Sequence, residues 1–326
     1  MMYEVTGEDY FKNLVIDYLK HYINEDGTIN FYNQEDYNID NISTGNALFF
    51  AYNITGHKKY RKAIEILMEQ LRNQPRTKTG NFWHKKIYPE QVWLDGLYMG
   101  QVFYMDYETQ YGGKEHYDDI ANQFKNVRKY IYNDEKGLYY HACDMAKQQR
   151  WADKGTGHSP NFWLRAMGWY LMALVDTMAV MEQSVYEYYR DLGDLFKEAL
   201  KGILKYQEKE SGLFYQIIDK AEVTGNYLET SGSAMIAYSI LKACRMKVIL
   251  SDKYEENAIK ILNSLIDTRI EEVDGCLQLG GTCSVAGLSD TRDGSVEYYL
   301  SEPIVYDDHK GVGPFIMAYA ESLRIK

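Results

Sequence analysis

Gly-Leu-Phe-Tyr at residues 212–215 and Ser-Gly-Ser-Ala at residues 231–234 are the most informative stretch of this sequence for the fold. The first is a glycine turn with apolar and aromatic residues, and the second is rich in small residues. A charged stretch with helical spacing, residues 184–207, comes before them. A helix with one apolar face lies at a surface, whereas a helix that is apolar on most sides lies in a buried layer. These residues therefore predict an outer helix, a hairpin-like turn and an inner helix in succession.

The same turn recurs along the chain, around Gly27, Gly80, Gly137, Gly212 and Gly275. A charged stretch with helical spacing precedes each glycine, and we predict these stretches to be outer helices. They cover residues 8–23, 57–73, 113–131, 184–207 and 252–269. A more apolar segment follows each glycine, and its small residues would let inner helices approach one another closely. Self-similarity of this kind predicts a repeated architecture.

Five such modules predict an all-α fold, a closed or nearly closed α/α toroid with the turns and the starts of the inner helices at one mouth. One domain, residues 1–326, then accounts for the whole chain. A linear solenoid of helical hairpins is the alternative, because a repeat alone does not establish closure. The long aromatic connections favour the toroid, since they fit a mouth better than the edge of a solenoid.

Composition and charge narrow the class of ligand. The chain has 31 tyrosines, 11 phenylalanines and 5 tryptophans. Such a composition suits a carbohydrate cleft, where rings pack on sugar C–H surfaces and phenols bond to sugar hydroxyls, although an aromatic core is the alternative. The net charge of −11 argues against nucleic acid and anionic membranes as partners, because both bind basic surfaces. An acidic sugar would be repelled unless the site gathers its own cations.

Several kinds of chemistry lack their sequence signatures. The seven histidines show no metal-ligand spacing, and the chain has no glycine-rich phosphate loop, dinucleotide fingerprint or Gly-x-Ser-x-Gly motif. We therefore expect no metal, no cofactor and no serine-hydrolase chemistry. The four cysteines are not spaced as a disulfide framework, so we expect reduced and mostly buried thiols. Without a recognisable leader or spanning segment, a cytoplasmic location is expected.

Two aspartates stand where a turn meets an inner helix. Asp95 lies in an apolar, aromatic helix start, residues 93–98, where a carboxylate has to be paired or hydrogen-bonded. Asp40 occupies the corresponding place in the first module. Two carboxylates that face one cavity would leave one of them protonated near neutral pH, as a proton donor. The alternatives are a satisfied structural aspartate at Asp95 and a helix N-cap at Asp40.

The third module is the richest in candidate residues. His141 lies near its turn, and Trp163, Arg165 and Trp169 fall at helical spacings at the start of its inner helix. This spacing would place a guanidinium between two indole rings, which suits a sugar ring that carries a carboxylate. A stacked structural arginine is the alternative. Arg165 would also supply the local cation that an acidic ligand requires.

These motifs resemble those of the unsaturated rhamnogalacturonyl hydrolases, glycoside hydrolase family 105. The resemblance rests on Gly-Asn-Phe-Trp-His-Lys (80–85), Trp-Leu-Asp-Gly-Leu-Tyr-Met-Gly (93–100) and Ser-Pro-Asn-Phe-Trp-Leu-Arg-Ala-Met-Gly-Trp-Tyr (159–170). Residues 212–216 and 226–233 extend it over nearly the whole chain. It implies an (α/α)6-type barrel and hydrolysis without a metal.

The resemblance also implies roles for residues. Asp95 would be the acid that gives a proton to C4 of a C4=C5 unsaturated uronic acid while a water adds at C5. Asp40 would keep Asp95 protonated, or hold the water and ring hydroxyls. The resulting hemiketal would collapse and release the next sugar. The substrate-binding residues would be His84, Lys85, Trp93, His141, Trp163, Arg165 and Trp169. The expected partner is a small acidic oligosaccharide, and a homo-oligomer is left open.

One departure from the family pattern concerns the first module. An (α/α)6 barrel has six helix pairs, and the sequence shows five complete ones, so we expect the first pair to be missing or shortened. Three other functions compete with the one implied. They are an unsaturated glucuronyl hydrolase acting on glycosaminoglycan fragments, a sugar epimerase or isomerase with histidine acid and base, and a sugar-binding protein without catalysis.

Overall fold

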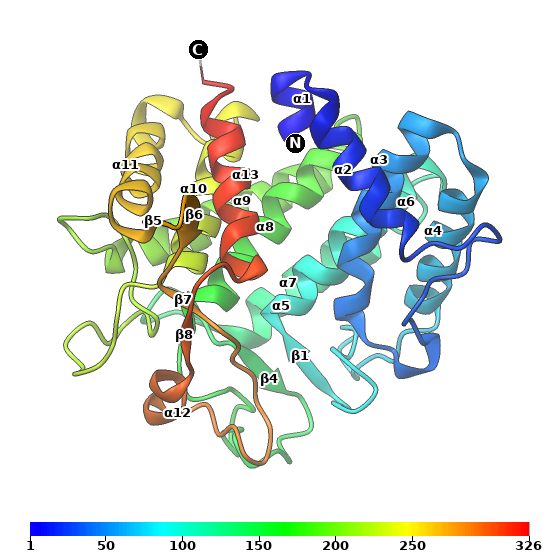
Figure 1. Cartoon of the computed structure of the whole chain (residues 1–326). Helices are drawn as coiled ribbons and strands as arrows, with labels where there is room; N and C mark the ends of the chain where they lie inside the picture. Colours follow the sequence, from blue (N-terminus) through cyan, green and yellow to red (C-terminus); the bar gives the residue numbers. More distant parts are fainter. Residues whose placement is uncertain (326) are drawn as a thin grey trace.

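The computed structural model describes residues 1–325, and helices dominate this part of the chain (Figure 1). The helices form an outer and an inner layer. The outer layer consists of α2 (Asp9–Lys20), α4 (Lys58–Arg72), α7 (Tyr117–Ile131), α9 (Tyr186–Ile203) and α11 (Ser251–Arg269). The inner layer consists of η2 (Ile39–Gly45) with α3 (Asn46–Thr55), α5 (Leu94–Gly96) with η3 (Leu97–Gln101) and α6 (Val102–Gln110), α8 (Leu164–Val180), α10 (Thr230–Arg245) and α13 (His309–Ser322).

The burial of each layer follows its sequence pattern. The outer helix α9 buries one stripe, which includes Leu192, Phe196 and Ile203, while its charged residues face solvent. The inner helix α8 is buried from Leu164 through Met178. The outer helix α9 therefore covers the buried inner helix α8, as the alternation of charged and apolar segments predicts.

The five repeated glycines explain why the turns recur. Gly27, Gly80, Gly137, Gly212 and Gly275 all have positive φ, between 73° and 95°. Residues with a side chain rarely adopt this conformation, whereas glycine adopts it without steric cost. A Cβ at Gly27 would in addition lie 2.4 Å from the Cβ of Lys62 in α4. Each turn thus requires its glycine for backbone geometry.

Short antiparallel strand pairs lie in the connections between the helices. Their bounds are β1 (Gln91–Trp93) with β4 (Ala142–Asp144), β2 (Tyr132–Asn133) with β3 (Leu138–Tyr139), β5 (Ile270–Val273) with β6 (Cys276–Leu279), and β7 (Thr282–Cys283) with β8 (Ile304–Val305). A short helix, α12 (Val296–Ser301), lies between β7 and β8. The pairing of β1 with β4 sets Trp93 opposite Ala142. It thereby joins the second and third modules beside Asp95.

The two ends of the ring meet through the five-residue helix α1 (Met2–Thr6) (Figure 1). Tyr3 in α1 packs edge-on against Phe50 in α3, with ring centroids 6.1 Å apart. Glu4 accepts a hydrogen bond at 2.8 Å from Arg324, which follows α13. The first and last modules are therefore bridged, and the toroid is confirmed over the linear solenoid. Within residues 1–325, five pairs of an outer and an inner helix form it, and α1 lies between α3 and α13 (Figure 1).

All four cysteines are free thiols, and Cys143, Cys244 and Cys283 are buried whereas Cys276 is exposed. Within residues 1–325, no helix combines the length and the apolar character needed to cross a bilayer.

Candidate active site

A cleft of about 530 Å³ opens at the N-terminal ends of the inner helices, which is the mouth that the repeat predicts. Residues of the inner layer line it, from η2, α5 with η3, α8 and α13. Of the nine residues predicted from the sequence, eight line this cleft. These are Asp40, His84, Lys85, Trp93, Asp95, Trp163, Arg165 and Trp169. Every module has the same order of outer helix, turn and inner helix. The starts of the inner helices therefore lie at one mouth of the toroid.

Asp95 lies in the first turn of α5, directly after β1. Its side chain is 16% exposed, and its Oδ2 atom is buried without a hydrogen-bond partner among the described residues. The backbone N–H of Leu94 donates to the carbonyl of His141 at 3.1 Å. This contact brings the imidazole of His141 beside Asp95, with Nε2 at 3.3 Å from Oδ2.

Asp40 lies in the first turn of η2, and its carboxylate is held by a lysine and a histidine side chain. Oδ2 is 2.7 Å from Nζ of Lys85, and Oδ1 is 3.2 Å from Nε2 of His84. Burial acts to raise the pKa of Asp40, but the charges and hydrogen bonds of His84 and Lys85 outweigh it and hold this pKa well below its usual range. The residue that caps η2 is Asn38, whose side chain accepts from the N–H of Asp40. The alternative reading of Asp40 as the cap is therefore wrong, and its carboxylate is left to face the cleft.

The lowered pKa of Asp40 predicts a pH-dependent contribution to stability. The unfolded value is about 3.9, so the contribution is present above about pH 4 and is lost as the pH falls through the lower folded pKa. We expect Asp40→Asn to lower the melting temperature by about 2 °C at pH 6, because the carboxylate is partly exposed and such pairs are weak. The difference should shrink between pH 4 and pH 3.

Thermal unfolding followed by circular dichroism from pH 6 to pH 3 measures this difference. Asp267→Asn is the matched control, since Asp267 is an exposed aspartate on the outer helix α11. A wild-type advantage over Asp40→Asn that stayed constant down to pH 3 would contradict the expectation.

Aromatic rings form two walls of the cleft. Trp93 stacks on His84 with centroids 4.9 Å apart and on Tyr88 at 5.3 Å, and both pairs are nearly parallel. Trp169 stacks on Tyr98 at 4.7 Å. Flat apolar surfaces next to cations and carboxylates are typical of sites that bind a charged sugar.

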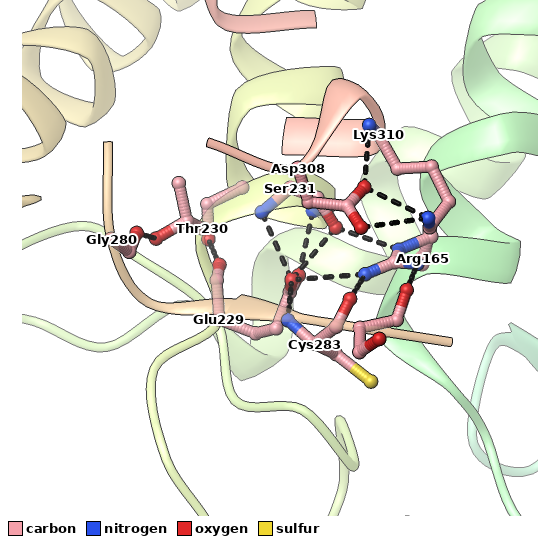
Figure 2. Close-up of polar contacts among 11 residues, drawn as sticks. Arg165, Glu229, Thr230, Ser231, Gly280, Cys283, Asp308 and Lys310 are labelled. Atoms are coloured by element: carbon pink, nitrogen blue, oxygen red, sulfur yellow. Dashed lines mark hydrogen bonds and ion pairs between the residues drawn. The ribbon is translucent and has the colours of Figure 1, made fainter. Parts of the chain in front are cut away.

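Arg165 is oriented differently from the sequence expectation (Figure 2). Its side chain is 1% exposed, and Nε donates to Oγ of Ser231 at 2.8 Å. Its Nη groups donate to the carbonyls of Cys283 and Ser284, and Nη2 lies 3.6 Å from Oε1 of Glu229. The guanidinium contacts the ring of Trp163, with 5.1 Å between Cζ and the ring centroid.

The predicted placement of this guanidinium between two indoles is wrong. Acceptors on α10, in β7 and just after it hold Arg165 on the side of Trp163, and Trp169 stacks on Tyr98 instead. Helical spacing put all three side chains at the start of α8, but it carried no information about acceptors from other modules.

His141 lies behind the cleft. Its imidazole is fully buried between Trp93 and Trp163, with centroids 5.1 and 4.7 Å away, and Nδ1 is 2.7 Å from the hydroxyl of Tyr299. It does not belong to the cleft lining, in contrast to the other predicted residues. Direct contact of His141 with a ligand therefore stays a prediction, whereas its contact with Asp95 is observed.

The cleft residues that the sequence reasoning missed include Tyr98, Arg292, His309 and Lys310. His309 and Lys310 stand at the start of the inner helix α13, so the rule that found Asp95 would also have found them. Lys310 is paired with Asp308 at 2.8 Å (Figure 2). Arg292 lies in the loop before α12 and makes no ion pair with any residue between 1 and 325. No local pattern marks it.

Over residues 1–325, no three His, Cys, Asp or Glu side chains come together in a way that could hold a metal ion. The arrangement instead offers two carboxylates, several cations and flat rings. Such a set is suited to proton transfer on a bound acidic sugar.

Comparison with known proteins assigns the family. A family model described as Glycosyl Hydrolase Family 88 matches residues 1–326. This chain belongs to that family. The glycoside hydrolase expected from the motifs is thereby confirmed as the class of enzyme.

Solved structures and curated relatives agree with this assignment. The structure of a family 105 glycoside hydrolase from C. acetobutylicum is 43% identical with a TM-score of 0.96, over 99% of this chain and 90% of that one. The protein Atu3128 of Agrobacterium fabrum is 39% identical over 69% of this family 88 chain and 98% of its own length. The unsaturated rhamnogalacturonyl hydrolase YesR of Bacillus subtilis is 26% identical over 83% of this chain and 72% of its own length.

Proposed function

We propose that this family 88 enzyme hydrolyses unsaturated galacturonyl-rhamnose oligosaccharides by hydrating the C4=C5 bond of the terminal uronic acid. The observation that carries the proposal is the placement of Asp95. Its carboxyl is accessible in a cleft whose other walls are flat rings and whose rim carries several cations. The similarity to YesR, a rhamnogalacturonyl hydrolase, supports the galacturonyl class of substrate.

The mechanism follows from the groups in the cleft. Asp95 gives a proton to C4 of the vinyl ether, and a water adds to C5 while its own proton passes to the Asp95 carboxylate. The product is a hemiketal at C5, which opens and releases the next sugar. Asp95 ends the cycle protonated, as it began. Ordinary glycosidases instead use two carboxylates at the anomeric carbon.

Asp40 has a supporting role in this mechanism. Its lowered pKa keeps it ionised at the working pH, so it accepts hydrogen bonds and does not donate a proton to carbon. Lys85 and His84 hold its two oxygens in place. In the proposed complex it binds ring hydroxyls and the attacking water, which leaves the acid role to Asp95.

The substrate carboxylate requires a cation, and two arginines are candidates. Arg165 carries the role that the family resemblance implies, but its donors already have acceptors in Ser231, Cys283 and Ser284. Arg292 lines the same cleft without an acidic partner in the described residues. We therefore assign the uronate carboxylate to Arg292, because a bidentate guanidinium contact needs free donors.

Arg292→Gln is expected to raise KM by about 10- to 100-fold with little change in kcat. The variant loses a charged hydrogen bond to the substrate carboxylate that is equally strong in the ground state and in the transition state. Steady-state kinetics on the unsaturated disaccharide measures the two constants. Arg190→Gln on the outer helix α9 makes the same charge change on an exposed side chain. An unchanged KM in Arg292→Gln would contradict this assignment and would indicate that Arg165 binds the substrate carboxylate.

The function itself is tested by the ultraviolet absorbance of the C4=C5 bond. Absorbance should disappear when the enzyme is incubated with unsaturated galacturonyl-rhamnose, and the saturated disaccharide should remain uncleaved. Loss of absorbance only with an unsaturated glucuronyl disaccharide would establish the glycosaminoglycan-type alternative. Tight binding by calorimetry with unchanged absorbance would establish a sugar-binding protein.

A further inference from the structure

Tyr299 is joined to Asp95 through a single buried histidine. The phenol oxygen of Tyr299, in α12, is 2.7 Å from Nδ1 of His141, and Nε2 of the same ring is 3.3 Å from Oδ2 of Asp95. Tyr299 and His141 are fully buried. The three side chains come from α12, from the residue before β4 and from α5, so the fold alone brings them into line.

The positions of the protons on Tyr299, His141 and Asp95 follow from the hydrogen-bond partners available to each group. The hydroxyl of Tyr299 has no hydrogen-bond partner except His141 within the described chain. A buried hydroxyl proton without an acceptor costs about 1–3 kcal/mol, so the proton points at Nδ1. A neutral imidazole that accepts at Nδ1 carries its hydrogen on Nε2. That hydrogen faces Oδ2 of Asp95.

The remaining polar atoms agree with this direction. Nε2 of His141 and Oδ2 of Asp95 are both buried without a hydrogen-bond partner in residues 1–325, and they lie 3.3 Å apart, so each is the nearest group available to the other. The other oxygen, Oδ1, makes no hydrogen bond with the described chain, and unlike Oδ2 it is not buried. Oδ1 is therefore the accessible oxygen of Asp95, which is itself part of the cleft lining.

We propose that Tyr299 is a positioning residue that fixes His141 as the Nε2–H tautomer and so places the acid proton of Asp95 on Oδ1, toward the substrate. This inference rests on the proposed function of Asp95 as the acid. With Nε2–H donating to Oδ2, that oxygen has no room for a proton. In the opposite tautomer, the bare Nε2 would accept a proton from Oδ2, and the acid would point away from the cleft.

No other polar group next to His141 competes with Tyr299 and Asp95 for its ring nitrogens within residues 1–325. Its other ring contacts are the indoles of Trp93 and Trp163, which carry no charge. The titratable groups that act on Tyr299 are Tyr298, Asp95, Cys283 and Asp293. Burial raises the pKa of Tyr299 further above its usual value, so its hydroxyl remains a donor throughout the working range of pH.

Tyr299→Phe is expected to lower kcat by about 10- to 100-fold, as is usual for a partner that orients another residue, with KM changed by less than about twofold. Tyr170→Phe is the matched control, because Tyr170 is equally buried in α8 and its hydroxyl has no partner in residues 1–325. Circular dichroism confirms that both variants fold. Equal kcat values in the two variants would overturn the proposal.

A spectroscopic measurement tests the tautomer without turnover. Nitrogen NMR of histidine-labelled wild type, with the His141→Gln spectrum used to assign the resonances, should show Nε2 protonated and Nδ1 unprotonated. Tyr299→Phe should move His141 toward a mixture of tautomers, and Tyr170→Phe should not. An Nδ1–H tautomer in the wild type would overturn the proposal. If the tautomer is as expected but no unsaturated uronide is consumed, the proposed function fails and the positioning contact stands.

Discussion

Asp95→Asn is expected to lower turnover of the unsaturated disaccharide by about 10³- to 10⁴-fold, because one side chain supplies both the proton for C4 and the base for the water. Asparagine has nearly the same shape but has no proton of sufficient acidity to give. The dissociation constant of the disaccharide should change by less than about threefold, since the cleft lining is otherwise intact. Absorbance assays measure turnover, and calorimetry with the inactive variant measures binding.

Asp106→Asn is the control for this substitution. Asp106 lies in α6, one helical segment beyond Asp95, and its carboxylate accepts a hydrogen bond from Gln110 outside the cleft. It should retain wild-type turnover. Full activity in Asp95→Asn, with activity lost in His141→Ala, would instead indicate a histidine acid and base of the epimerase or isomerase type.

Arg165→Met is expected to destabilise the fold by about 3–5 kcal/mol, because it leaves a buried carboxylate without its counter-charge. Glu229 is fully buried, and Figure 2 shows its carboxylate facing Arg165. It also accepts from the N–H groups of Gly232 and Cys283 and from Ser231, at 2.7–3.1 Å. These donors stabilise Glu229 but carry no full positive charge. Urea denaturation of the wild type and the variant measures the loss.

The double variant Arg165→Met with Glu229→Gln is the matched control. Removing both charges should recover most of the lost stability, since breaking a buried pair costs more than replacing it. If the double variant folds well and binds the disaccharide with wild-type affinity, Arg165 is structural. A loss of less than about 1 kcal/mol in Arg165→Met alone would show that the charge of Glu229 is compensated elsewhere.

Local patterns account for most of the architecture. The stretch predicted as an outer helix over residues 57–73 is α4, Lys58–Arg72, and the stretch over 252–269 is α11, Ser251–Arg269. These predictions were accurate because amphipathic spacing and a glycine with positive φ act over a few residues. The same local reasoning placed Asp95 and Asp40 at inner-helix starts on one cleft.

Orientation of the side chains at the site required more than local patterns. His141, whose contact with a ligand stays a prediction, lies behind Asp95 and contacts Tyr299, which no local pattern indicated. The guanidinium of Arg165 was expected between two indoles, and it points to acceptors on α10 and in β7. The spacing of residues along α8 does not reveal which other module supplies an acceptor.

The sequence by itself therefore determined the helical toroid, the family and the mouth at which Asp95 and Asp40 lie. Only the tertiary structure decided which residues hold them. Tyr299 and His141 are separated by 158 positions, and Arg165 and Cys283 by 118. Contacts of this range depend on how the ring of helices closes, because closure sets which distant loops meet. No periodicity within one helix or turn contains that information.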